Sequence, residues 1–182
     1  MPRLVPAFAL AVATIGSACG EDFVLPPAQV ANRVDTVVLY AIDGTPLTAP
    51  SAYNLVFGQT IRTDRTSDFD FAVNVSGDTT LLFPTGAMGL SDWSGWVRVP
   101  NAFDEVLLAP SVEYVAEEPA VLALGDVLVL RSRFVSCFGS QLPVYGKIEV
   151  LATSLENRSV SLQLLLNRNC GYRGLEPGTP AQ

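Results

Sequence analysis

Apolar and polar residues alternate along much of the chain after Arg33, which is the period of a β-strand. In FDFAVNV, residues 69–75, the odd positions are apolar, whereas Asp70 and Asn74 occupy even positions. A strand points successive side chains to opposite faces, so the pattern predicts one face in a core and the other in water. Because a Ser-Gly-Asp turn then precedes TTLLF, the stretch from Phe69 to Phe83 is predicted to form a hairpin.

A second hairpin is predicted near the C-terminus. GKIEVLATS, residues 146–154, continues through Leu155-Glu156-Asn157 into RSVSLQLLL, residues 158–166. At the period of a strand, each segment places a set of apolar side chains on one face. These sets are Ile148, Val150 and Ala152 in the first segment, and Val160, Leu162, Leu164 and Leu166 in the second.

The segment AVLALGDVLVLRSRF, residues 120–134, is apolar at both odd and even positions around Gly125-Asp126. This pattern suits strands covered on both faces, and periodicity alone also permits a short buried helix. Further strands are predicted at Thr36–Ile42, Ala52–Phe57 and Trp96–Val99. With 14 Gly and 13 Pro as turn residues, the chain is predicted to be all-β. The expected architecture is an antiparallel β-sandwich or partly closed barrel of about 8 to 10 short strands.

The N-terminal segment has a different pattern. A short polar start with Arg3 is followed by an apolar run from Leu4 to Ile15 and then by the small residues Gly16-Ser17-Ala18. That order is typical of a secretory signal peptide, which is removed from the mature protein. An ordinary buried helix is the alternative, and Pro6 disfavours it because proline breaks helices.

Gly16-Ser17-Ala18-Cys19 resembles the end of the lipobox of bacterial lipoproteins. The resemblance implies that residues 1–18 are a signal peptide and that the Cys19 thiol carries a diacylglycerol. Two or more acyl chains would make membrane attachment effectively permanent. Gly16 stands where the family usually has Leu, so cleavage by ordinary signal peptidase is the alternative.

The same resemblance has consequences for domain organisation and location. Residues 19–32, with Pro26-Pro27, are expected to be a lipidated flexible tether, and residues 33–182 a single extracytoplasmic β domain. Gly20 follows the anchor in place of the Asp that retains some lipoproteins in the inner membrane. The outer membrane of a bacterial envelope is therefore favoured.

The cysteine count agrees with a lipid anchor. The chain has three cysteines, and an odd thiol in an exported protein needs an explanation. If Cys19 carries lipid, Cys137 and Cys170 remain to form a disulfide in an oxidising compartment. Two free buried thiols or a metal pair are the alternatives, and without histidine two cysteines make a poor zinc site.

Composition narrows the functional classes. Of the 182 residues, 49% are hydrophobic and 16% are charged, which suits one folded domain. The net charge of −7 would repel nucleic acid over most of the surface. Because the sequence contains no histidine, Ser-His-Asp and Cys-His catalysis are excluded. No catalytic residue is assigned and no cofactor is predicted.

Two clusters are candidate binding sites. Asp64, Asp68 and Asp70 could supply hard oxygen ligands for calcium, or could form a solvated strand face with nearby arginines, Arg62 and Arg65, as counterions. Trp93 and Trp96, in SDWSGWVRVP, could stack on a sugar ring or line an apolar groove, or could belong to the core or to a lid over it.

The body of the chain is similar to exported bacterial lipoproteins that end in a Cys-Gly-Tyr-Arg motif. The similarity rests on DGTPLTAPSAY, FDFAVNV and NCGYRGLEPG, and it implies no activity. A binding module with an envelope protein or glycan partner is the leading hypothesis. The alternatives are a glycan hydrolase pairing Asp68 or Asp70 with Glu113 or Glu117, or a purely structural envelope component.

Overall fold

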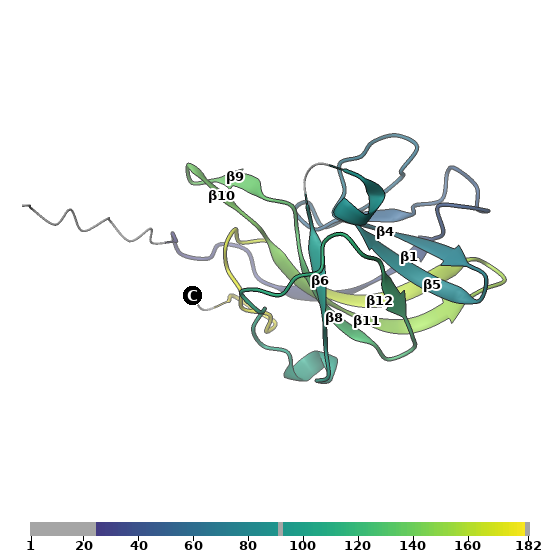
Figure 1. The fold of residues 1–182 in the computed structure, drawn as a ribbon. Coiled ribbons are helices and arrows are strands. Elements are labelled where there is room, and N and C mark those ends of the chain that lie inside the picture. Colours follow the sequence, from purple (N-terminus) through teal and green to yellow (C-terminus); the bar gives the residue numbers. More distant parts are fainter. Residues whose placement is uncertain (1–24, 91–92, 181–182) are drawn as a thin grey trace, which may run out of the picture.

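The computed structural model describes residues 25–90 and 93–180, so the predicted signal peptide and the predicted lipidation site, Cys19, lie outside the described residues. Two five-stranded antiparallel sheets pack face to face, and a two-stranded hairpin projects from one end (Figure 1). The first sheet has the order β1 (Arg33–Tyr40), β12 (Ser159–Asn167), β11 (Tyr145–Ser154), β8 (Val127–Arg131), β6 (Gly95–Val99). The second has the order β3 (Gln59–Ile61), β2 (Ala52–Asn54), β4 (Phe71–Ser76), β5 (Thr79–Pro84), β7 (Ala120–Leu122). The projecting hairpin is formed by β9 (Val135–Cys137) and β10 (Ser140–Leu142).

The all-β prediction is confirmed, and of its two architectures the structure shows the sandwich, because neither sheet closes into a barrel. Helical structure within the described residues is limited to two short 3₁₀ turns, η1 (Gly86–Met88) and η2 (Phe103–Glu105). The twelve strands outnumber the predicted set because several have only three residues. Strands of that length give too short a pattern for alternation to identify.

Both predicted hairpins are present, as β4–β5 and β11–β12. One predicted face is wrong. Ile148 and Val150 are buried in the core, but Ala152 is exposed because the β11–β12 register shifts between Val150 and Ala152. An extra residue in one strand moves every later side chain to the opposite face, and alternation in the sequence does not reveal where that happens.

The main core lies between the two sheets. It combines the inward side chains of β12, among them Leu162 and Leu164, with Phe71 and Val73 of β4. A second apolar cluster lies on the outer face of the first sheet, where Val129 and Leu165 contact Phe103 and Leu175 from segments outside the sheet. The first sheet is therefore covered on both faces around β8 and β11, which explains why β8 is apolar at consecutive positions and confirms the two-sided burial expected there.

Lys147 fixes the segment that covers this outer face. Its side chain is 1% exposed, and its Nζ donates hydrogen bonds to the carbonyl oxygens of Phe103, at 2.6 Å, and Val106, at 3.0 Å. Nζ also lies 4.4 Å from the centroid of the Phe103 ring. Burial lowers the pKa of this amine. The two carbonyls and the aromatic ring partly replace the water that the ammonium group loses.

The first described residues pack on the domain, which corrects the expectation of a flexible tether for residues 25–32. Asn169 Oδ1 accepts hydrogen bonds from the backbone N–H groups of Gln29 and Val30. Tyr172 Oη donates to Pro26 O at 2.7 Å. Asn32 is buried and pairs with Gly178 near the C-terminus. The polar side chains that hold this segment come from the far end of the chain, so local composition gave no sign of them.

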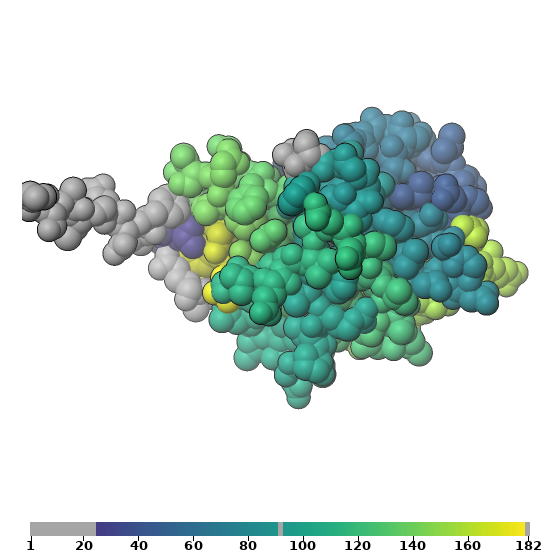
Figure 2. All heavy atoms as spheres, in the orientation of Figure 1, coloured from purple at the N-terminus to yellow at the C-terminus, as the bar shows by residue number. Residues whose placement is uncertain are grey.

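The β9–β10 hairpin continues the paired strands β8 and β11 beyond the end of the sandwich. It lies at the same end as the first described residues and the C-terminal segment (Figure 2). The predicted disulfide is present: Cys137, in β9, is bonded to Cys170, which follows β12, with a Cα–Cα distance of 6.3 Å. The bridge joins the hairpin to the segment that holds residues 25–32.

Replacing both cysteines, in a Cys137→Ser/Cys170→Ser variant, should lower the free energy of unfolding by about 3 to 4 kcal/mol, because the bridge closes a loop of about 34 residues in the unfolded chain. Urea denaturation without reductant measures this difference. As a control, a reducing agent should destabilise the parent by a similar amount and leave the double variant unchanged. Equal midpoints for parent and variant would contradict the prediction.

Candidate functional site

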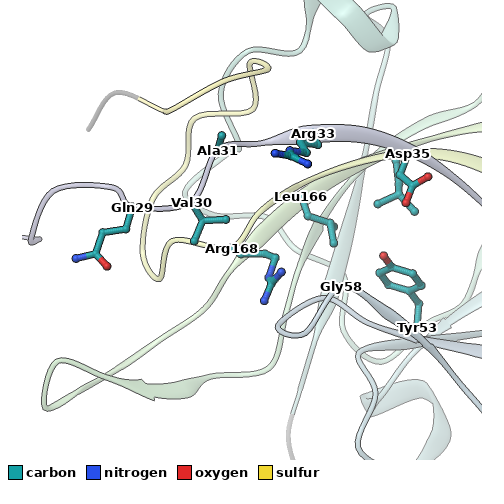
Figure 3. A pocket seen from close by; sticks show the side chains of 10 residues that line it. Gln29, Val30, Ala31, Arg33, Asp35, Tyr53, Gly58, Leu166 and Arg168 are labelled. Carbon is teal, nitrogen blue, oxygen red and sulfur yellow. The ribbon is translucent and has the colours of Figure 1, made fainter.

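An open hollow of about 540 Å³ lies where the edge strand β1 and the β2–β3 turn leave the two sheets apart (Figure 3). We call it the β1 hollow. Its wall is charged on one side and apolar on the other. It is lined by Gln29, Val30, Ala31, Arg33, Asp35, Tyr53, Gly58, Leu164, Leu166 and Arg168.

The register of β1 explains the charged wall. Arg33 lies opposite Leu166 and Asp35 opposite Leu164, and both leucines point into the space between the sheets. Arg33 and Asp35 therefore share the inward face of β1, yet both remain exposed because the short second sheet does not reach over them. Inward charges on an edge strand also discourage pairing with another strand.

Tyr53 forms the floor of the β1 hollow together with the two leucines. Its ring is 3% exposed and stacks on Phe71, with 5.7 Å between ring centroids. Burial, reinforced by the negative charge of Asp35, raises the pKa of the Tyr53 hydroxyl to about 12. The phenol is therefore neutral at physiological pH and points towards Asp35 (Figure 3).

Two guanidinium groups border the β1 hollow without an ion-pair partner. Among the described residues, the arginines that form ion pairs are Arg62, Arg98 and Arg133. Arg33 and Arg168 are both exposed, and Arg168 Nε makes a long hydrogen bond of 3.3 Å to Val56 O. With Asp35 as the carboxylate on the wall, the hollow carries a net positive charge above an apolar floor.

The three aspartates proposed as calcium ligands each have an arginine partner instead. Asp64 pairs with Arg62 at 2.7 Å, which is the counterion arrangement considered as the alternative. Asp68 and Asp70 both bind Arg133, at 2.5 Å and 3.2 Å. No group of three His, Cys, Asp or Glu side chains in residues 25–90 and 93–180 could hold a metal ion. The arrangement thus supports ion pairing rather than a metal site.

Asp70 is completely buried at the junction of the two sheets. Its carboxylate accepts hydrogen bonds from the backbone N–H of Leu55, at 2.7 Å, and from that of Arg133, at 2.9 Å. Burial raises the pKa of this carboxyl, and the two N–H donors and the Arg133 guanidinium oppose that rise. The hydroxyl of Ser94 donates to the backbone carbonyl of Asp70, which extends the network to the loop before β6.

The two tryptophans have different environments. Trp96 packs against the main core from β6, and its indole N–H donates to Glu118 O at 2.9 Å. Trp93 lies outside the strands and is 50% exposed. The core interpretation therefore fits Trp96, whereas a ligand-stacking role for Trp93 stays a prediction.

The carboxylates suggested for a glycan hydrolase differ in burial and in bonding partners. Asp70 is buried and bound to Arg133, and Asp68 shares that arginine. Glu113 and Glu117 are exposed in the segment between β6 and β7. A hydrolase needs two accessible carboxyl groups facing one another across a bound sugar, and the occupied carboxylate of Asp70 does not favour that chemistry.

No protein-family model and no curated protein matches the sequence. No helix in the part of the chain that the structure describes is long and apolar enough to cross a membrane. The disulfide indicates an extracytoplasmic protein, because such bridges persist in oxidising compartments.

Sequence reasoning missed the β1 hollow entirely. None of the five predicted site residues, Asp64, Asp68, Asp70, Trp93 and Trp96, lines it. The available signal was the pair Arg33 and Asp35 at alternate positions just before the apolar run Val37-Val38-Leu39. That pair identifies one wall, but the opposing Tyr53, Gly58 and Arg168 come from distant segments.

Asp70→Ala should lower the free energy of unfolding by about 2 to 6 kcal/mol, because it leaves two backbone N–H groups without their acceptor, at about 1 to 3 kcal/mol each, and leaves Arg133 with Asp68 as its remaining partner. Thermal or urea unfolding measures the loss. Asp64→Ala, which breaks a surface pair, is the matched control and should change stability little. Similar effects for the two variants would contradict the structural role of Asp70.

Proposed function

We propose that the protein is a lipid-anchored, extracytoplasmic binding module of a bacterial envelope, and that the β1 hollow is its ligand site. The observation that carries the binding role is the pair of guanidinium groups, Arg33 and Arg168, that form no ion pair with any described residue and lie above an apolar floor. Exposed arginines without carboxylate partners can bind an anionic group of a ligand.

Support for the anchor comes from the cysteines. Because Cys137 and Cys170 are bonded to each other, Cys19 is the remaining cysteine of the three in the chain. It ends a segment with the order of a signal peptide and a lipobox-like sequence. Gly20 in the following position favours the outer membrane.

The chemistry of the β1 hollow fits a ligand with an anionic head and an apolar body. Arg33 and Arg168 would bind a carboxylate or phosphate, and the neutral Tyr53 hydroxyl could donate a further hydrogen bond to it. Leu164 and Leu166 would contact the apolar part of the ligand. Asp35, towards which the Tyr53 hydroxyl points, disfavours a ligand that carries more than one negative charge (Figure 3).

Mass spectrometry of the chain purified from membranes of an expressing bacterium tests the anchor. The expected N-terminus is Cys19 bearing a diacylglycerol, and Cys19→Ser should release the protein from the membrane fraction. A mature chain that begins at another residue, or at Met1, would refute the lipid anchor without bearing on the β1 hollow.

Calorimetry with decanoate and decyl phosphate tests the ligand site, and the two probes separate carboxylate from phosphate recognition. Arg33→Ala and Arg168→Ala should each weaken binding about tenfold or more, since a hydrogen bond to a charged group contributes about 1.5 to 3 kcal/mol. Arg65→Ala, an exposed arginine outside the hollow, is the control. Binding that all three variants retain equally would exclude this site.

A further inference from the structure

The β9–β10 hairpin presents aromatic side chains to solvent at the end of the domain where the described chain begins. Phe134 is 54% and Phe138 61% exposed. From Phe134 to Gly146 the sequence has no charged residue, although Arg133 and Lys147 flank it on either side. The hairpin therefore combines two exposed phenylalanines with a run of uncharged residues, on a chain whose net charge is −7.

Phe138 also has a backbone conformation that side chains of its kind rarely adopt. It forms the turn together with Gly139, and the φ angles of the two residues are 53° and 78°. Asn or Gly would adopt this turn at lower cost. Phe138 thus combines left-handed backbone geometry with an exposed ring, and neither feature contributes to the core. Strain of this kind is a reason to look for a function.

The hairpin tip lies close to the point where a lipid anchor would hold the chain. Phe138 lines the same shallow groove as Pro26 and Pro27. Cys19 precedes Leu25 by six residues, a segment that spans at most about 20 Å when fully extended. A lipid on Cys19 would therefore keep this end of the domain near the bilayer.

We propose that the tip of the β9–β10 hairpin inserts Phe138 into the headgroup region of the membrane that holds the protein, with Phe134 adding exposed apolar area at the base of the hairpin. The proposal rests on the lipid anchor at Cys19. Each phenylalanine contributes apolar area, and the absence of charge between Phe134 and Gly146 avoids the cost of placing an ion in a region of low polarity.

The position of Arg168 favours a lipid bilayer, rather than another protein, as the partner of the exposed phenylalanines. It lines the same groove as Phe138, is exposed, and belongs to none of the ion pairs among the described residues. Its guanidinium group can remain at the level of lipid phosphates while the phenylalanine rings lie deeper. The disulfide at Cys137 holds the hairpin to the domain in this orientation.

Tryptophan fluorescence on vesicles of phosphatidylethanolamine and phosphatidylglycerol tests the contact. The Phe138→Trp and Leu155→Trp variants are compared with the unsubstituted protein. Each of the three proteins is held on the vesicles by a lipid on Cys19. Leu155 is 46% exposed in the β11–β12 turn at the opposite end of the first sheet, so it is a matched control. The tryptophan added at 138 should emit at shorter wavelength and be quenched by brominated lipids, and the one at 155 should not.

Phe134→Trp keeps the test decisive if a tryptophan at 138 disturbs the turn. If neither hairpin tryptophan is quenched more than the one at 155, the membrane contact is wrong and the exposed rings belong to a protein interface. Failure of the lipid anchor gives a different result, an unmodified Cys19 thiol in mass spectrometry. That thiol can then be coupled to a maleimide phospholipid, so the hairpin is still tested on a chain held at the same residue.

Discussion

The buried carboxylate of Asp70 connects the parts of the molecule on which both proposals depend. It precedes β4 in the second sheet and accepts hydrogen bonds from Leu55, at the turn that borders the β1 hollow, and from Arg133, at the base of the β9–β10 hairpin. A buried charge needs such partners because water no longer solvates it. One side chain thus positions the edge of a candidate ligand site and the base of a projecting hairpin.

The middle strands of the first sheet are covered on both faces. The main core covers its inner face, and the segment around η2 with Leu175 covers the outer face, where Lys147 binds two carbonyls of that segment. A strand buried on both sides can be apolar at every position. The second sheet is shorter and leaves β1 partly uncovered, which creates the β1 hollow.

The β9–β10 hairpin lies at the end of the sandwich where the described chain begins (Figure 1). The disulfide starts from Cys137 in β9, and Gln29 and Val30 of the first described segment line the β1 hollow. Residues 25–32 pack on the domain there, so under the proposed lipid anchor at Cys19 only residues 20–24 would separate the anchor from the packed segment. A short connection restricts how the domain is oriented. In the proposed arrangement, the ligand site and the exposed phenylalanines would face the region close to the membrane.

The sequence by itself determined the all-β fold class and both long hairpins, because alternation is a property of the chain alone. It also predicted the pairing of Cys137 with Cys170 through the lipobox resemblance at Cys19, and the structure contains that bond. It also indicated the arginine partner of Asp64, two residues away. Tertiary structure decided the bulge that exposes Ala152, the burial of Asp70 against Arg133, and the assembly of the β1 hollow. Each of these features depends on which distant segments come into contact. The hydrophobic period of a segment indicates only which of its own side chains face the core and which face solvent.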